Sequence, residues 1–247
     1  MMNCRLSLIF ALTLLLAACA ETIVPTPKAG QRYLDEGNAF FERQNYTDAI
    51  ASWEKVRDSY QSAELTATAD YRIAEARFLN QDYLEAATAF ESFIQQHPDH
   101  PHIADALYYL GIAYFEQMLS ADRDQTATKN AILSLRNFTS RYPEDKRVTK
   151  AREVIEACNV RLAEHELYVG HFYLRTDHYQ AAIKRLTPIP KQYPAFTELD
   201  RVYLYLGQAH LRAGQSAEAV DIFNTLYAKF PDSKYVDKAR KTLAKEY

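Results

Sequence analysis

The sequence predicts an all-α protein in which five pairs of antiparallel helices follow one another and a single helix caps the last pair. Glycine is scarce, with 6 among 247 residues, while Tyr and Phe number 18 and 12. This composition suits helices, because glycine destabilises a helix interior. Small residues, alanines, large apolar residues and prolines also recur at fixed distances, which indicates a repeat architecture.

The N-terminal segment predicts export. Residues 6–16 form an apolar run, LSLIFALTLLL, which is shorter than the ~20 residues of a membrane span and suits a secretory signal. The following Leu16-Ala17-Ala18-Cys19 resembles the bacterial lipobox. We therefore expect a signal peptide at 1–18 and a lipidated tether at 19–28, with lipid on Cys19. The alternative is an ordinary signal peptide in which the cysteine falls there by chance.

The lipobox resemblance also implies a location. It implies several acyl chains, among them palmitate, and two or more chains hold a protein durably on a membrane. Ala20 stands where an aspartate would signal retention in the inner membrane. We expect the chain to be lipid-anchored in the cell outer membrane, on its periplasmic face. Cys158 would then be the last free thiol in an oxidising compartment, and its helical surroundings predict a small buried side chain.

The helix pairs align on a small residue of each first helix. In four units this residue is Gly37, Ala74, Gly170 or Gly207. Twelve residues later stands an alanine: Ala49, Ala86, Ala182 or Ala219. Four residues beyond it comes a large apolar side chain: Trp53, Phe90, Leu186 or Phe223. Each unit then closes at Gln61, Pro98, Pro194 or Pro231. A further unit runs from Gly111 through Ala131 and Leu135 to Pro143, with eight extra residues between its helices.

These offsets match the tetratricopeptide pattern. The small residue lets two helices cross closely, and the proline ends the second helix because it has no N–H to donate. Lys146 to Arg175 lacks proline and carries apolar residues at helical spacing, so we expect one helix of about thirty residues. It should join an N-terminal lobe (repeats 1–3, residues 29–145) to a C-terminal lobe (repeats 4–5, residues 146–247). The lysine-rich segment 234–246 reads as the capping helix.

Three features of the chain resemble the BamD (ComL) family of outer-membrane assembly lipoproteins. They are the lipobox followed by five units, Asp122-Arg123-Asp124 at the start of the second helix of the third unit, and the long helix carrying the run from Ala163 to Tyr173. The resemblance implies a scaffold of the β-barrel assembly machinery. Its partners would be the periplasmic domains of BamA, other components of the complex, and unfolded β-barrel outer membrane proteins, whose folding and insertion it would promote. The alternative is another envelope tetratricopeptide-repeat lipoprotein that coordinates peptidoglycan or pilus assembly proteins.

The resemblance also assigns a docking residue. Arg185 matches a basic position of the family's face for BamA, and a guanidinium suits a carboxylate across an interface. The alternative is a solvated surface arginine. Pro188 and Pro190 interrupt the helix just after it, which departs from the family's pattern.

Repeat geometry predicts a peptide-binding lining on the first helices of repeats 1–3. The candidates lie one and four or five positions after each small residue, or three before it. They are Asn38, Phe41, Tyr71, Glu75, Phe78, Tyr108, Ile112 and Phe115. Aromatic and polar side chains together suit an extended segment with an aromatic end, such as a strand of a β-barrel.

Catalysis is not expected. The sequence has no nucleophile motif, P-loop or dinucleotide fingerprint, and we predict no enzyme activity and no cofactor. His97, His100 and His102 could ligate zinc or nickel, but Pro98 and Pro101 favour a turn between helices. A net charge of −3 without a basic block argues against a nucleic-acid partner.

Overall fold

The computed structural model describes residues 27–59 and 62–246. It divides into two compact units, unit 1 (Met1–Ile73) and unit 2 (Ala74–Tyr247). The predicted signal peptide, Cys19 and most of the predicted tether lie outside the described residues. Within the ranges that are described, no helix is long and apolar enough to cross a membrane.

Unit 1 contains α2 (Pro27–Glu42), α3 (Tyr46–Asp58) and the first part of α4 (Ala63–Leu79), which continues into unit 2. The first helix begins two residues earlier than predicted, at Pro27, because proline is tolerated in the first turn of a helix. α2 packs on α3. Trp53 of α3 is fully buried, and its Nε1 donates to the carbonyl oxygen of Leu34 at 3.3 Å. This tryptophan holds the first pair together.

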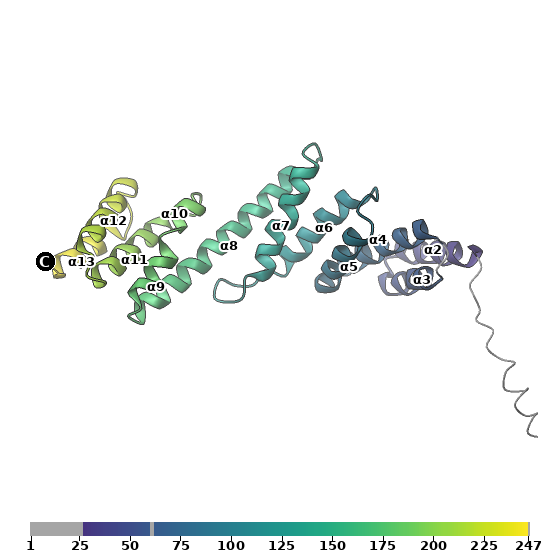
Figure 1. The fold of residues 1–247 in the computed structure, drawn as a ribbon, viewed down its shortest axis with the longest axis horizontal. Helices are drawn as coiled ribbons and strands as arrows, with labels where there is room; N and C mark the ends of the chain where they lie inside the picture. Colours follow the sequence, from purple (N-terminus) through teal and green to yellow (C-terminus); the bar gives the residue numbers. More distant parts are fainter. Residues whose placement is uncertain (1–26, 60–61, 247) are drawn as a thin grey trace, which may run out of the picture. The chain divides into compact units, whose positions relative to one another are not determined.

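Unit 2 continues as a series of helices that follow one another along the chain (Figure 1). They are α5 (Tyr83–Gln96), α6 (Ile103–Glu116), α7 (Thr126–Arg141), α8 (Val148–Arg175), α9 (Tyr179–Leu186), α10 (Ile189–Gln192), α11 (Leu199–Arg212), α12 (Ser216–Lys229) and α13 (Val236–Glu246). The described residues form helices and no strand, so the all-α fold is confirmed. α6 packs on α7, α8 on α9, and α11 on both α12 and α13.

The predicted long helix is α8, which has 28 residues and is therefore about 42 Å long. Its first half packs on α7 and its second half on α9 and α11 (Figure 1). A continuous apolar core extends from Ala163 in α8 to Ala239 in α13. The structure separates its two units at residue 73, and the proposed lobe boundary at 145 stays a prediction.

Each helix pair crosses at the small residue that the sequence identified. A Cβ added to Gly37, Gly111, Gly170 or Gly207 would lie closer than 3.0 Å to the large side chain of the second helix. That side chain is fully buried in every unit: Trp53, Phe90, Leu135, Leu186 and Phe223. The alanines of the second helices are equally buried. The sequence offsets therefore mark the real contact points between helices.

The turn inside four of the pairs has one conformation. The residue seven positions after the small residue has a positive φ: Gln44 (59°), Gln81 (65°), Asp177 (61°) and Gly214 (76°). The next residue donates its N–H to a carbonyl five residues back, for example Asp82 to Arg77 at 2.9 Å. This is the Schellman arrangement that ends α-helices. In the third unit the eight extra residues replace it.

Proline fixes the end of the second helix in four of the five units, whereas the first unit has Gln61 at this position. The residue before the proline has φ close to −130° and ψ close to 60° at His97, Tyr142, Tyr193 and Phe230. Proline disfavours helical backbone in the preceding residue, so the helix stops there. The next helix then begins five residues after the proline, at Ile103, Val148, Leu199 and Val236.

Two details differ from the sequence expectations. Asp122, Arg123 and Asp124 precede α7, whose N-cap residue is Gln125, and an Asp124 carboxylate oxygen accepts the N–H of Thr126 at 2.8 Å. The last helix begins at Val236, after the turn that follows Pro231, and two residues later than predicted.

Candidate partner-binding surfaces

The predicted peptide-binding residues of unit 1 lie around one aromatic cluster. Phe41 is half-buried between Tyr46 (5.6 Å between ring centroids) and Trp53 (5.7 Å). The guanidinium of Arg72 lies over the Phe41 ring, 5.5 Å from its centroid. Asn38 is half-buried, whereas Tyr71 is 4% exposed, which leaves little of its ring for a ligand.

The same aromatic arrangement recurs in unit 2. Phe78 meets Tyr83 at 5.6 Å with an interplanar angle of 67°, the values that Phe41 and Tyr46 also have. Repeat positions four and nine residues after the small residue therefore share one geometry. Phe78 also meets Tyr109 at 5.0 Å.

Tyr109 is a residue that the repeat offsets missed. It belongs to α6, the first helix of the third repeat, and contacts Phe78 of α4, Phe90 of α5 and Tyr108 of its own helix. Burial raises the pKa of the Tyr109 hydroxyl, and the nearby Glu75 carboxylate raises it further. The structure thus brings Glu75, Phe78 and Tyr108 together around Tyr109. The sequence feature that could have identified Tyr109 is its position directly after the candidate Tyr108.

Ile112 and Phe115 follow on α6 and are half-buried. Tyr108 is more constrained, because it packs on Phe138 of α7 (5.4 Å) and lies under the guanidinium of Arg147 (5.0 Å). The lining thus falls into a unit 1 group and a unit 2 group. As a peptide-binding site it stays a prediction.

Arg185 lies at the edge of a cavity of about 470 Å³ between α8, α9 and α10. Its lining includes Glu166, Tyr173, Lys184, Arg185 and Ile189. The Nη1 atom of Arg185 donates to both carboxylate oxygens of Glu166 at 3.2 Å. The arginine side chain is 45% exposed, so its remaining N–H groups face solvent. This geometry leaves Arg185 able to donate to a second carboxylate.

The proline pair shapes that cavity. α9 ends at Leu186, and the four-residue α10 begins at Ile189, as the interruption by Pro188 and Pro190 predicts. Leu186 and Ile189 are both fully buried, so they anchor the break in the core. The break leaves Pro188 and Gln192 at the rim of the cavity.

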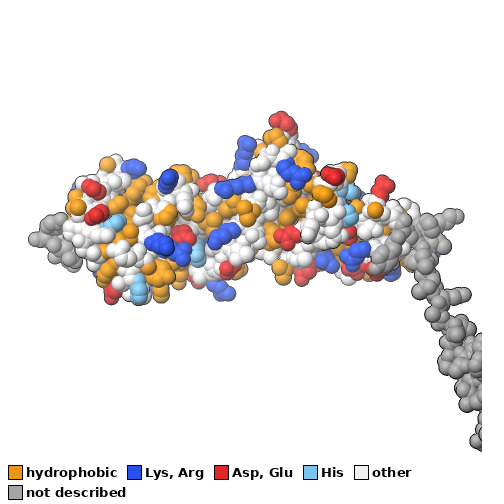
Figure 2. All heavy atoms as spheres, viewed as in Figure 1, with side chains coloured by type: hydrophobic (Ala, Val, Ile, Leu, Met, Phe, Trp, Pro, Cys, Tyr) orange, Lys and Arg blue, Asp and Glu red, His pale blue; other side chains and the backbone are white. Residues whose placement is uncertain are grey.

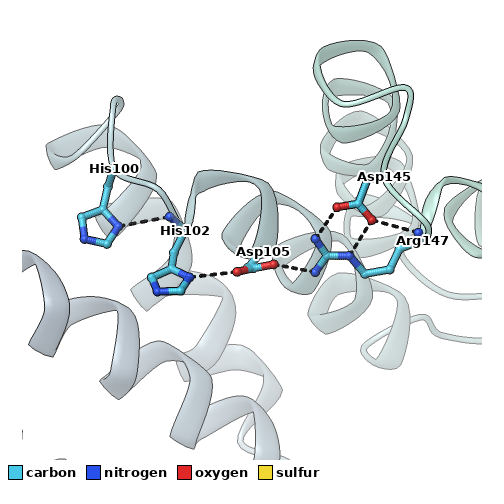
Figure 3. A network of polar contacts seen from close by, with 5 residues as sticks. All are labelled: His100, His102, Asp105, Asp145 and Arg147. Carbon is cyan, nitrogen blue, oxygen red and sulfur yellow. Dashed lines mark hydrogen bonds and ion pairs between the residues drawn. The ribbon is translucent and has the colours of Figure 1, made fainter.

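The histidine segment forms a turn with its own hydrogen bonds (Figure 3). His100 Nδ1 accepts the N–H of His102 at 3.2 Å, and His102 Nδ1 lies 2.9 Å from Asp105. The corresponding turns of later repeats have the same bond, in which Asp145 accepts the N–H of Arg147 and Ser233 accepts the N–H of Tyr235. Among the described residues, no group of three or more His, Cys, Asp or Glu side chains is placed to hold a metal. His100 therefore serves the repeated turn.

Arg147 joins that turn to the next repeat. It pairs with Asp105 at 2.7 Å and donates to both oxygens of Asp145, at 2.9 and 2.7 Å (Figure 3). Its guanidinium also covers the rings of Tyr108 and Phe138. The bond from Arg147 lowers the pKa of Asp145 to about 2. One side chain thus links α6, α7 and the start of α8.

Comparison with known proteins places the chain among bacterial outer membrane proteins. The family model described as YfiO, outer membrane lipoprotein, matches residues 28–219. The outer membrane protein assembly factor BamD of Caulobacter vibrioides is 29% identical over 230 residues, covering 91% of this chain and 75% of the relative. The BamD of Rickettsia prowazekii is 26% identical over 213 residues, covering 86% and 84%. Among solved structures, the TPR2AB domain of yeast Sti1 aligns with a TM-score of 0.43 and 18% identity, covering 88% of this chain and 82% of that one.

Proposed function

The chain belongs to the YfiO family of outer membrane lipoproteins, and from this membership we propose that it is a scaffold for the assembly of β-barrel proteins in the outer membrane. The observation that carries the proposal is the family match over 28–219, joined to relatives that are named outer membrane protein assembly factors and align with most of the chain. The architecture of paired helices supplies surface for binding other proteins.

The docking partner we propose is the periplasmic part of BamA. Its site on this chain would be the cavity between α8, α9 and α10, with Arg185 donating to a carboxylate of the partner. The exposed guanidinium and its solvent-facing N–H groups support this role. Glu166 would hold Arg185 in place through the Nη1 atom. The other two guanidinium nitrogens would then be available for the carboxylate of the partner.

The second proposed role is the binding of unfolded β-barrel segments by the aromatic positions of the first three repeats. Half-buried rings such as Phe41, Phe78 and Phe115 support it, because they offer apolar surface that the fold does not fully cover. We further propose that lipid on Cys19 anchors the chain to the outer membrane. A scaffold in this place would hold client segments close to the membrane that receives them.

A pull-down from detergent-solubilised membranes tests the docking role. The wild-type chain should retain BamA, and Arg185→Glu should reduce that retention at least tenfold, because it places a carboxylate where a cation is needed. Arg212→Glu is the matched control, since Arg212 is similarly exposed (54%) and lies outside the cavity. Absence of BamA from the wild-type eluate would refute the proposal and favour another envelope scaffold.

The peptide-binding role has its own test. Phe78→Ala combined with Phe115→Ala should weaken binding of C-terminal peptides from β-barrel proteins, measured by fluorescence anisotropy. Phe172→Ala is the control, because Phe172 is an exposed phenylalanine outside the first three repeats. An unchanged affinity in a double variant with native circular dichroism would exclude these positions.

A further inference from the structure

A groove on unit 2, which adjoins the Arg185 cavity at Gln192, has no assigned occupant. It has a volume of about 490 Å³ and lies between α7, α8 and the end of α10. One face of α7 lines it with Lys129, Ile132, Leu133 and Arg136, which have the i, i+3, i+4, i+7 spacing of a helical stripe. Leu162 and Tyr193 complete its apolar wall.

The charged side chains that line this groove are all basic. Lys129 and Arg136 are the only charged side chains of the lining, and no carboxylate of the described residues forms an ion pair with either. Asp124, whose pKa Lys129 helps to lower, is bonded to the N–H of Thr126. Figure 2 shows Lys and Arg side chains over the region of α7 and α8. By contrast, Arg185 in the neighbouring cavity is paired with Glu166.

The apolar part of the groove is open to solvent. Leu133 is 65% exposed, more than any other large hydrophobic residue of the described chain, although Ile132 beside it is 6% exposed. An exposed leucine between two cations on one helical face is a surface that an apolar side chain flanked by carboxylates would complement.

The spacing of the two cations suits an extended occupant. Lys129 and Arg136 are seven residues apart on one helix, which separates them by about 10 Å along its axis. In an extended strand the side chains i, i+2 and i+4 lie on one face and span about 13 Å. The long side chains of Lys129 and Arg136 can meet two carboxylates at that spacing.

We propose that this groove binds an extended acidic segment of a partner protein, with two carboxylates four residues apart on Lys129 and Arg136 and an apolar side chain midway between them on Leu133. The Gln192 side chain, which makes no hydrogen bond within the described residues, borders the groove and can bond the backbone of the segment. The cations and the leucine that define this site do not line the Arg185 cavity, although Gln192 borders both.

A charge-swap experiment tests the proposal with the full chain in detergent. The probe is a fluorescein-labelled synthetic peptide with two glutamates four residues apart and a leucine midway between them, and a second peptide has lysines in place of the glutamates. The wild-type chain should bind the acidic peptide at least tenfold more tightly. Lys129→Glu with Arg136→Glu should reverse that preference. Lys150→Glu with Lys241→Glu, two exposed positions outside the groove, has the same net charge and should keep the wild-type preference.

The apolar contact has a matched control. Leu133→Asn should weaken the acidic peptide at least fivefold, whereas Leu84→Asn, at a leucine of similar exposure (63%) on α5, should not. Equal binding of both peptides by the wild-type chain, or equal loss in both charge-reversed pairs, would overturn the proposal. So would a groove variant that changes only self-association in sedimentation. Because no BamA is present, a negative result leaves the docking proposal untouched, and loss of BamA retention leaves the groove untouched.

Discussion

At the scale of single residues, the close crossing of the helix pairs depends on a very small residue at the contact point. Gly207 of α11 touches the ring of Phe223, and a Cβ at this position would lie within 3.0 Å of that ring. Phe223 is itself fully buried. In such close packing, even one added methyl group forces the neighbouring side chains to shift.

Gly207→Ala should therefore destabilise the protein by about 1–3 kcal/mol, the usual cost of overpacking, although alanine alone favours a helix by about 1 kcal/mol. Urea denaturation followed by circular dichroism measures the change. Ala74→Gly is informative beside it, because Ala74 occupies the same repeat position and should lose helix propensity and one buried methyl group without any clash. A Gly207→Ala variant as stable as the wild type would show that Phe223 can move.

A second residue-scale effect lies in the turns. Gln81 has a φ of 65°, a conformation that costs an L-residue about 1–2 kcal/mol. The equivalent position in the last repeat is Gly214. Gln81→Gly should stabilise the protein by about 0.5–1 kcal/mol after the entropy of glycine is subtracted. Gln95→Gly, inside α5, should do the opposite, and a thermal melt of both variants distinguishes the two outcomes.

The predicted burial of Cys158 is confirmed. The side chain is fully buried, and burial raises the pKa of its thiol to about 11. Since only the thiolate reacts readily, Cys158 should resist a maleimide reagent at pH 8 in the native protein and react once the protein is unfolded in guanidinium. Fast labelling of Cys158 in the native state, located by mass spectrometry, would contradict its burial.

At the scale of elements, an ion pair stabilises the turn between α7 and α8 in addition to apolar packing. Arg147 binds Asp145 through two nitrogens and reaches Asp105 on α6. The arginine side chain is 20% exposed, so the pair is partly shielded from water. It therefore fixes the direction in which the long α8 leaves the third repeat.

This pair predicts how stability changes with pH. The pKa of Asp145 is lowered to about 2 in the folded state by its bond from Arg147, against about 3.9 when unfolded. A lowered folded pKa stabilises the protein fully above the unfolded pKa, and the effect is lost as pH falls from about 4 to about 2. Asp145→Asn should lower stability by about 1 kcal/mol at pH 7, and the difference from wild type should vanish near pH 2. Asp99→Asn, at an exposed position in another turn, should show no such convergence in urea titrations.

At the scale of the whole molecule, the proposed function requires the chain to stay at the membrane. The proposed anchor is Cys19, which follows Leu16-Ala17-Ala18. Cys19→Ala should release the protein into the periplasmic fraction, since the acyl chains would have no attachment point. Cys158→Ala should remain membrane-bound. Retention of the Cys19 variant in carbonate-washed membranes would refute the lipid anchor.

Much of this fold was readable from the chain by itself. The small residues, alanines and prolines predicted which helices cross, where each second helix stops and which large side chain fills each pair. These features follow from local sterics, because proline restricts its neighbour and a close crossing admits only a small side chain. The long α8 followed from apolar spacing without a proline. These constraints act between residues that are close in the chain, so they recur in each unit that has the same residues at the same spacing.

Only the tertiary structure decided what the side chains far apart in sequence do to one another. Tyr109 became the centre of an aromatic cluster, Arg185 acquired Glu166 as its partner, and Arg147 bridged three elements. It also left Leu133 exposed between two cations. Such pairings depend on how helices of different repeats rotate against each other, and a change of one helical position, about 100°, moves a side chain to another face. Periodicity fixes the contacts within a repeat, whereas the contacts between repeats need the packed molecule.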